Sequence, residues 1–363
     1  MRTTEKMAQW KELMHHLGER FERRAGEHDE TDRFVAENYA DLREHGFLAV
    51  GIPEELGGSG VPHSEMADLI RLLGQHCSST ALANSMHQHL LAAMIWKTRK
   101  GQGGEETLRQ IADRQPVMVS TGARDWLESN GETKRVKGGY RISAVKHFAS
   151  QSAGGDLLVT SAPFEDPAEG WKVLHFAVAF DSEGLSVGDD WKAMGMRGTG
   201  SHSVRLESVF VPESAITLER PQGEFHPFWN VILTVALPLI MGAYLGIAQR
   251  ASRIAIAAAK KQKNPKPYLA SAVGAMNNEL TTAELNWQDM ERIANDLDFD
   301  PVDENGHEMV TRKTNVASAC IGVVTKAMEI VGGQGFYRTF GLERLFRDVQ
   351  AAHYHPLQEK DQV

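Results

Sequence analysis

The feature that most constrains this chain is a stretch without a charged side chain, Val231 to Ala248. So much contiguous apolar surface has to be removed from water. The stretch is long enough to span a membrane. However, Pro238 interrupts it, its alanine and glycine residues suit close helix–helix packing, and the segment that follows is amphipathic. The sequence therefore predicts a buried helix packed among other helices, with a membrane-spanning helix as the alternative.

The spacing of apolar residues changes twice along the chain. Residues 1–115 show helical spacing, and residues 116–215 show short alternating or apolar runs separated by Gly, Pro and Asp. Residues 216–363 return to helical spacing. We therefore expect an α+β protein in which a small antiparallel β-domain lies between two helical parts.

Composition excludes several classes of protein. Apolar residues make up 42% of the chain and charged residues 24%, as in ordinary soluble proteins. The formal net charge is −9, and basic residues are not concentrated enough to bind nucleic acid. Two cysteines, Cys77 and Cys320, are too few for a disulfide framework, and the charged N-terminus lacks the apolar core of a signal peptide. We expect a cytoplasmic protein that binds neither nucleic acid nor a membrane.

A second informative stretch runs from Met328 to His355, MEIVGGQGFYRTFGLERLFRDVQAAHYH. Taken alone, its cluster of glycines indicates the C-cap of a helix. Together, the GGQG turn and the later Arg-Asp pair resemble the C-terminal signature of the acyl-CoA dehydrogenase family. Two other segments are similar to the same family, FVAENYADLREHGFLAVGIPEELGGSG and WKAMGMRGTGSHSVRLESVFVP.

The resemblance implies a fold and a cofactor. Residues 1–115 would form an N-terminal helical domain, residues 116–215 a small antiparallel β-barrel or sandwich domain, and residues 216–363 a C-terminal four-helix bundle. In this family FAD lies between the bundle and the β-domain. The glycine turn serves the FAD of a neighbouring subunit, which implies a homodimer or homotetramer. Residues 261–266, KQKNPK, replace residues that contact that FAD, so FMN is the alternative cofactor.

The resemblance also implies individual cofactor contacts. Phe148 takes the place of an aromatic residue against the flavin ring, and Ser150 that of a hydroxyl at the N5/O4 edge. Arg197 and Ser201 suit flavin or substrate phosphates. The full set of implied contacts is Ser120, Thr121, Phe148, Ser150, Arg197, Thr199, Ser201, Gly332, Gly333 and Gly335. Without the resemblance, these residues indicate only a buried Phe, a strand-end Ser and a glycine-rich hairpin.

The catalytic position departs from the family. Acyl-CoA dehydrogenases use a glutamate to remove the substrate's α-proton while a hydride passes to flavin N5. The two places for that glutamate align with Pro356 and approximately with Ala236, and neither residue is acidic. The first hypothesis is therefore an acyl-CoA dehydrogenase with a displaced base, His355 or Glu359, and with electron-transfer flavoprotein as its partner.

The second hypothesis is a monooxygenase of the same fold. Such an enzyme uses oxygen and reduced flavin from a flavin reductase and needs no carboxylate; Ser150 and His355 would hydrogen-bond the oxygenated flavin. A third hypothesis is a protein that binds flavin or acyl-CoA without turnover. The resemblance makes Ser150 and His355 the catalytic candidates, and His87, His89 and Tyr354 the candidates for substrate contact. Residue spacing predicts no metal site.

Overall fold

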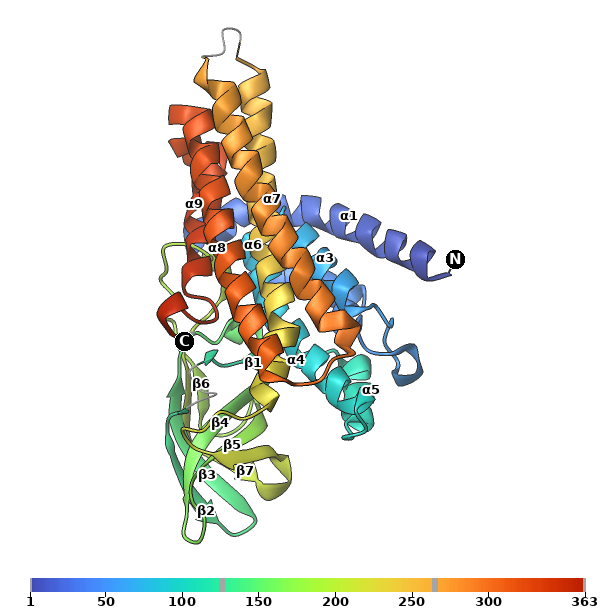
Figure 1. Ribbon diagram of the computed structural model, residues 1–363. Coiled ribbons are helices and arrows are strands. Elements are labelled where there is room, and N and C mark those ends of the chain that lie inside the picture. The colour runs from blue at the N-terminus through green and yellow to red at the C-terminus, as the bar shows by residue number, and fades with distance from the viewer. Residues whose placement is uncertain (1, 124–127, 263–266, 362–363) are drawn as a thin grey trace.

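The computed structural model describes residues 2–123, 128–262 and 267–361 (Figure 1). The helices before the strands are α1 (Arg2–Thr31), α2 (Ala36–Glu44), α3 (His63–Gly74), α4 (Ser78–Arg99) and α5 (Glu105–Arg114). The strands are β1 (Met118–Ser120), β2 (Glu132–Val136), β3 (Gly139–Lys146), β4 (Leu157–Asp166), β5 (Gly170–Ala179), β6 (Leu185–Val187), β7 (Val204–Pro212) and β8 (Ile216–Pro221). The later helices are α6 (Phe228–Lys260), α7 (Tyr268–Ala294), α8 (Asp303–Val331) and α9 (Leu342–Val349). The predicted α+β fold class is confirmed.

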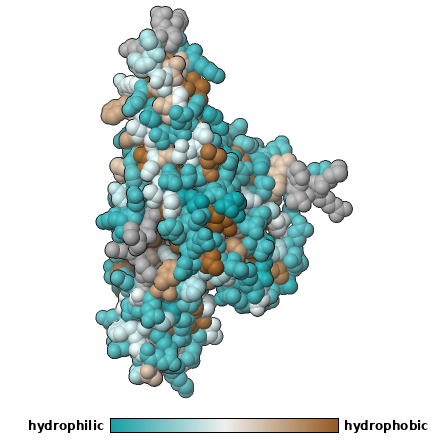
Figure 2. Space-filling model, in the orientation of Figure 1, coloured by the Kyte–Doolittle hydropathy of each residue, from teal (hydrophilic) through white to brown (hydrophobic). Residues whose placement is uncertain are grey.

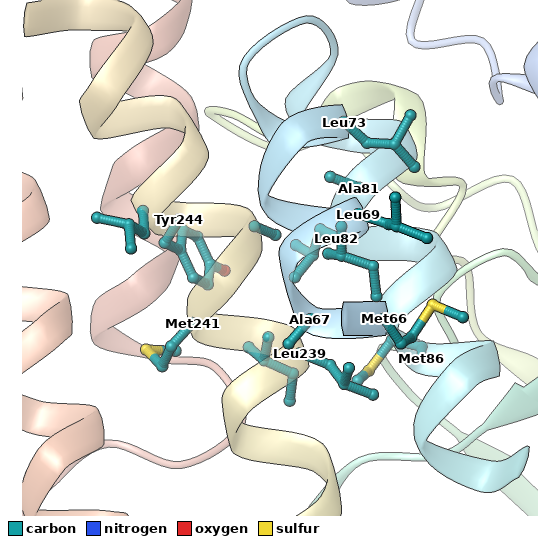
Figure 3. Packing of buried hydrophobic residues seen from close by; sticks show 14 of the residues in the cluster. Met66, Ala67, Leu69, Leu73, Ala81, Leu82, Met86, Leu239, Met241 and Tyr244 are labelled. Atoms are coloured by element: carbon teal, nitrogen blue, oxygen red, sulfur yellow. The ribbon is translucent and has the colours of Figure 1, made fainter. Parts of the chain in front are cut away.

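The uncharged stretch forms the buried part of α6. The most apolar window of this helix is 100% buried, and α6 packs against α3, α4, α7 and α8. Figure 3 shows its side chains Leu239 and Tyr244 on the side that faces α3 and α4, whereas Met241 points away from these two helices. A second segment, Asp303–Phe336, also has the length and apolar content of a membrane span, with 44% of its window buried. On the face drawn in Figure 2, hydrophilic residues dominate the surface.

Glycine allows α3 and α6 to approach each other at backbone distance. A Cβ atom added to Gly74 of α3 would lie 2.5 Å from the carbonyl oxygen of Ala243, and one added to Gly246 of α6 would lie 2.2 Å from that of Arg71. Both distances are far inside van der Waals contact, so any side chain here would separate the helices. The small residues of the stretch therefore serve helix–helix contact, as the sequence predicts.

The strands form two four-stranded sheets within the described residues. Their strand orders are β1-β4-β5-β8 and β2-β3-β7-β6. Apolar residues from both sheets make a separate small core. One pairing departs from the expected antiparallel arrangement: β1 runs parallel to β4, with Met118 opposite Leu157. This short strand arrives from α5 rather than from a neighbouring hairpin, so no tight turn dictates its direction.

His87 of α4 is a structural residue, which corrects its expected role as a substrate contact. The residue is 0% exposed. Its Nε2–H donates to the carbonyl oxygen of Leu48 (2.7 Å), and its Nδ1 accepts the backbone N–H of Met118 (3.2 Å). Both ring nitrogens are therefore occupied by backbone groups, and the ring joins α4 to β1. Burial lowers the pKa of His87 to about 4.

We expect His87 to make stability depend on pH. The unfolded chain takes up a proton near pH 6.5, whereas the folded His87 does so only near pH 4. The part of the free energy of unfolding that depends on His87 should therefore fall as the pH drops below 6.5, by roughly 2 kcal/mol at pH 5, in addition to the losses from other buried histidines such as His89. Urea unfolding at pH 7 and pH 5 measures this loss, which should be smaller in His87→Gln. The exposed His45→Gln is the control, and an equal loss in all three proteins would contradict the assignment.

Two neighbouring residues of α9 connect three parts of the chain. The backbone N–H of Met196, in the loop before β7, donates to Asp348 Oδ1 (2.6 Å). Arg347 donates to both carboxylate oxygens of Asp29 in α1 (2.9 and 2.6 Å) and to the carbonyl oxygen of Met194 (3.0 Å). A Cβ on Gly195 would lie 2.4 Å from the carbonyl oxygen of Arg347, so only glycine fits between these contacts. We call this set of contacts the α9 clamp.

Loss of the Asp348 carboxylate should destabilise the protein. Asp348→Ala leaves the Met196 N–H without an acceptor in a buried position, which costs about 2–3 kcal/mol. The exposed Asp189, in the same stretch before β7, provides a matched control whose replacement by Ala should change stability by less than about 0.5 kcal/mol. Chemical denaturation of both variants measures the difference. Equal stability of the two variants would show that the clamp contributes little.

Candidate functional site

The segments after β3 and before β7 lie side by side because these two strands are neighbours in one sheet. Their ends pair at Lys146 and Val204. Beyond this pair, Ala149 N–H donates to the carbonyl oxygen of His202 (3.2 Å) and Gln151 N–H to that of Thr199 (2.8 Å). The structure therefore brings together the two segments that supply half of the expected cofactor contacts.

Three hydroxyl groups form a row between these segments. Thr199 Oγ1 lies 2.7 Å from Ser201 Oγ, which lies 2.9 Å from Ser150 Oγ. At the inner end of the row, Thr199 Oγ1 donates to the carbonyl oxygen of Met196 (2.8 Å). The exposed fraction rises outward along the row, from 0% at Thr199 through 6% at Ser201 to 8% at Ser150. We call this arrangement the hydroxyl row.

An exposed aromatic ring stands beside the hydroxyl row. Phe148 is 69% exposed, has a positive φ of 57°, and meets Trp191 edge-on with 6.3 Å between ring centroids. Thr121 follows the end of β1, and its hydroxyl lies 3.0 Å from that of Thr160. An uncovered aromatic face next to buried hydroxyls suits a flat, polar-edged ring such as isoalloxazine. These residues therefore fit a flavin.

The C-terminal segment after α9 carries the predicted catalytic histidine. Nδ1 of His355 is buried without a hydrogen-bond partner, and its neighbour Tyr354 is 63% exposed. The buried Lys313 of α8 fixes this segment by donating to the carbonyl oxygen of Leu357 (2.7 Å). Burial, followed by the charges of Lys313 and His89, lowers the pKa of His355 to about 3. The imidazole is therefore neutral at physiological pH.

Contacts through α4 and β1 connect this segment to the hydroxyl row. Gln151, next to Ser150, donates to the carbonyl oxygen of Met118 (2.7 Å), whose N–H donates to His87. His89, two residues further along α4, lies close enough for its charge to affect His355. Burial lowers the pKa of His89 to about 4, and its Nδ1–H donates to the Ser85 carbonyl oxygen (3.4 Å). His89 and His355 therefore lie near each other.

Two of the expected phosphate or cofactor contacts face elsewhere in this subunit. Arg197 Nε donates to the carbonyl oxygen of Ala193 (3.0 Å) and lies 3.7 Å from Oδ1 of Asp32, just after α1, so residues of this subunit already engage the guanidinium. Thr199 is 0% exposed and can touch no cofactor. Its role as a direct contact is therefore wrong, and it can act on a ligand only through Ser201. Ser120 ends β1 opposite Val159, where it is half-buried.

The glycine turn lies away from the hydroxyl row of the same subunit. It follows the end of α8, at the opposite end of the bundle from the strands (Figure 1). Along the helix axis, Val331 is about 27 Å from Lys313. A Cβ on Gly332 or Gly333 would meet nothing within 4 Å, whereas Gly335 packs against Leu342. These glycines can therefore reach a cofactor only outside their own subunit's site.

Sequence reasoning did not single out Lys313, Gln151 or Tyr39. Lys313 lies in α8 at helical spacing from buried Val316, Ala317 and Cys320, so a lone lysine on an apolar face was the available signal. Gln151 is 0% exposed, and Tyr39 OH donates to its side-chain oxygen. These partners are far apart in sequence, so no local pattern indicates them.

One open cavity of about 620 Å³ lies between the loop after α2 and the ends of α4 and α5. Its lining includes Glu54, Glu55, Arg99 and Glu105, and none of the predicted site residues. Among the residues whose structure is described, no group of His, Cys, Asp and Glu could hold a metal ion. The expected chemistry therefore concentrates around Phe148, the hydroxyl row and the C-terminal segment.

Comparison with known proteins gives consistent matches over almost the whole chain. The family models for the N-terminal and C-terminal domains of acyl-CoA dehydrogenase match residues 4–114 and 239–359. YdbM of Bacillus subtilis (strain 168), named provisionally as an acyl-CoA dehydrogenase, is 28% identical over 96% of this chain and 93% of its own length. Amino sugar nitrososynthase DnmZ of Streptomyces peucetius is 28% identical over 89% of this chain and 83% of its own.

A solved structure with the same architecture is methanesulfinate monooxygenase MsuC from Pseudomonas fluorescens. Its TM-score is 0.82 at 25% identity, covering 95% of this chain and 92% of that chain. The matches include both ends of the chain and the order of helices and strands. This chain therefore belongs to the acyl-CoA dehydrogenase family of flavoproteins.

Proposed function

We propose that this chain is a reduced-flavin-dependent monooxygenase that oxidises a small organic substrate. The observation that carries this proposal is the neutral imidazole of His355 beside the place where the family has its catalytic glutamate. Among the described residues, the charges that act on His355 come from Lys313 and, when it is protonated, His89, and none comes from a carboxylate.

The pKa of His355 decides between proton abstraction and hydrogen bonding. A group with a pKa of about 3 has little affinity for a proton at neutral pH, so it is a weak base and poorly suited to removing an α-proton. The same property suits a group that must hydrogen-bond without becoming charged. Monooxygenation needs this second role and no catalytic carboxylate. The nitrogen- and sulfur-oxidising relatives are consistent with this reading.

The chain's own residues have separable roles in this proposal. Bound reduced flavin would supply the electrons that activate molecular oxygen. Phe148 would cover one face of the ring, and Ser150 would hydrogen-bond its edge. His355 would hydrogen-bond the reacting oxygen through Nδ1, the buried atom without a partner. Lys313 would hold the C-terminal segment in place through the Leu357 carbonyl oxygen.

FMN and FAD are both candidates, and a flavin reductase is the proposed partner. We also propose a homo-oligomer, because Gly332 and Gly333 are open to a neighbouring subunit and lie away from the hydroxyl row of their own. Acyl-CoA dehydrogenation is the second candidate function. It is favoured by the similarity to YdbM, and Glu359, whose charge acts on Lys313, would then be the base.

Two assays on the same flavin-loaded protein distinguish the candidates. Anaerobic mixing with a panel of acyl-CoA thioesters should leave the oxidised flavin spectrum unchanged. Incubation with a flavin reductase, NADH, oxygen and a panel of sulfinates, thioethers and amines should give an oxygenated product. Bleaching of the flavin by any acyl-CoA, without oxygenated product in the second assay, would establish the dehydrogenase instead.

Replacement of His355 should uncouple flavin oxidation from substrate oxidation. His355→Ala removes the proposed hydrogen bond, so product formed per reduced flavin consumed should fall at least about 100-fold, with hydrogen peroxide released instead. The control is His353→Ala, which changes an exposed histidine two residues away. Wild-type coupling should also show no ionisation of His355 between pH 5 and pH 8, since its pKa is about 3. Full coupling in His355→Ala would refute the role.

A further inference from the structure

The hydroxyl row can carry its hydrogen bonds in either direction. Each hydroxyl has one proton to donate and can accept two. In the inward direction, Ser150 donates to Ser201, Ser201 to Thr199, and Thr199 to the carbonyl oxygen of Met196. In the outward direction, Thr199 donates to Ser201 and Ser201 to Ser150. The measured separations of 2.7 to 2.9 Å allow both.

The carbonyl oxygen of Met196, at the inner end of the row, has a donor in both directions. The carbonyl oxygen of Met196 also accepts the N–H of Thr199 (3.1 Å) and the indole N–H of Trp191 (3.1 Å). It therefore remains satisfied when the Thr199 hydroxyl turns towards Ser201. The outward direction gives up the hydrogen bond from the Thr199 hydroxyl to Met196, and the hydrogen bond that Ser150 then donates to an outside acceptor replaces it. The group that faces Ser150 from outside can therefore set the direction of the row.

The direction decides what Ser150 offers to that outside group. In the inward direction, Ser150 donates its proton to Ser201 and can only accept a hydrogen bond from the outside group. In the outward direction, Ser150 accepts from Ser201 and can donate a hydrogen bond to the outside group. Flavin N5 makes the opposite demands in its two redox states: oxidised N5 accepts a hydrogen bond, whereas reduced N5 carries a hydrogen and donates one.

We propose that Thr199, Ser201 and Ser150 form a reversible hydroxyl relay that matches Ser150 to both redox states of a flavin. This inference rests on the proposed function, in which the N5 edge lies at Ser150. Only hydroxyl rotations are involved, so no proton leaves the row. Thr199 is 0% exposed and acts as a positioning residue, because it links the row to the acceptor that permits the inward direction.

Thr199→Val tests the relay by removing one hydroxyl at nearly constant shape. Without the Thr199 hydroxyl, Ser201 can donate only to Ser150 within the row, so Ser150 donates to the outside group. Oxidised N5 can still accept this hydrogen bond. Reduced N5 is itself a donor, so one hydroxyl proton of the row is left without an acceptor. We expect Kd for reduced flavin to rise about tenfold and Kd for oxidised flavin to change less than about threefold.

The measurement is anaerobic titration of the cofactor-free protein with oxidised and with dithionite-reduced FMN, repeated with FAD. The tenfold change in the ratio of the two constants equals a shift of about 30 mV in the two-electron potential of the bound flavin. Partial unfolding lowers both affinities equally and leaves their ratio unchanged. Thr199→Ser should restore the wild-type ratio.

Ser152→Ala is the matched control. Its hydroxyl is 2% exposed and donates to the Gly200 carbonyl oxygen (3.0 Å), outside the row, so the ratio should stay at the wild-type value. If Thr199→Val does not fold, Ser201→Ala interrupts the row at its middle and should shift the ratio in the same direction. An unchanged ratio in a folded row variant would overturn the relay alone. Failure of wild-type protein to bind either flavin would overturn the proposed function as well.

Discussion

The α9 clamp is the interaction on which the arrangement of the rest depends. A buried carboxylate that accepts a backbone N–H is a strong and directional contact, and Asp348 directs it at the loop that leads into β7. The two terminal nitrogens of its neighbour Arg347 donate to the carboxylate of Asp29, so α1 is held at the same place. The hydroxyl row begins at Met196, the residue that Asp348 holds. The inner end of the candidate site is thus fixed to helices from both ends of the chain.

The C-terminal side of the candidate site is built differently. His355 lies in a short segment after α9, and Lys313 of α8 positions this segment by donating to the carbonyl oxygen of Leu357. The nearby cation and the partial burial of the ring both favour a neutral imidazole. A row of hydroxyls on one side and an uncharged histidine on the other suit the proposed oxygen chemistry on a flavin. It offers no carboxylate in the family's usual place.

The sequence predicts the parts of this structure that depend on local pattern. The buried helix α6 follows from an uncharged stretch with small residues. The change of apolar spacing locates β1 to β7, whereas β8 (Ile216–Pro221) lies beyond the predicted boundary at residue 215. His87 and His89 are two residues apart on α4, so they point to different faces of the helix. Their spacing cannot tell which face meets β1 and which meets His355, because that depends on residues far away in the chain.

Errors arise where a distant partner decides the role of a side chain. Arg197 resembles a phosphate ligand until Asp32 and Ala193 are seen to engage it. Thr199 resembles a cofactor contact until its complete burial is known. Lys313 passes unnoticed, since its importance comes from a carbonyl group 44 residues later. The family resemblance therefore indicates the cofactor class better than it assigns individual contacts.

The position of His355 on a short terminal segment has an evolutionary consequence. Substitutions there would alter the proposed catalytic group without disturbing the packing of α6 or the pairing of the strands. Exchange of a glutamate for a His-Pro pair in such a segment is a small genetic step with a large chemical effect. An ancestral scaffold could thereby acquire a new reaction while its folding stability stayed almost untouched, and related genes with different chemistries could diverge from it repeatedly.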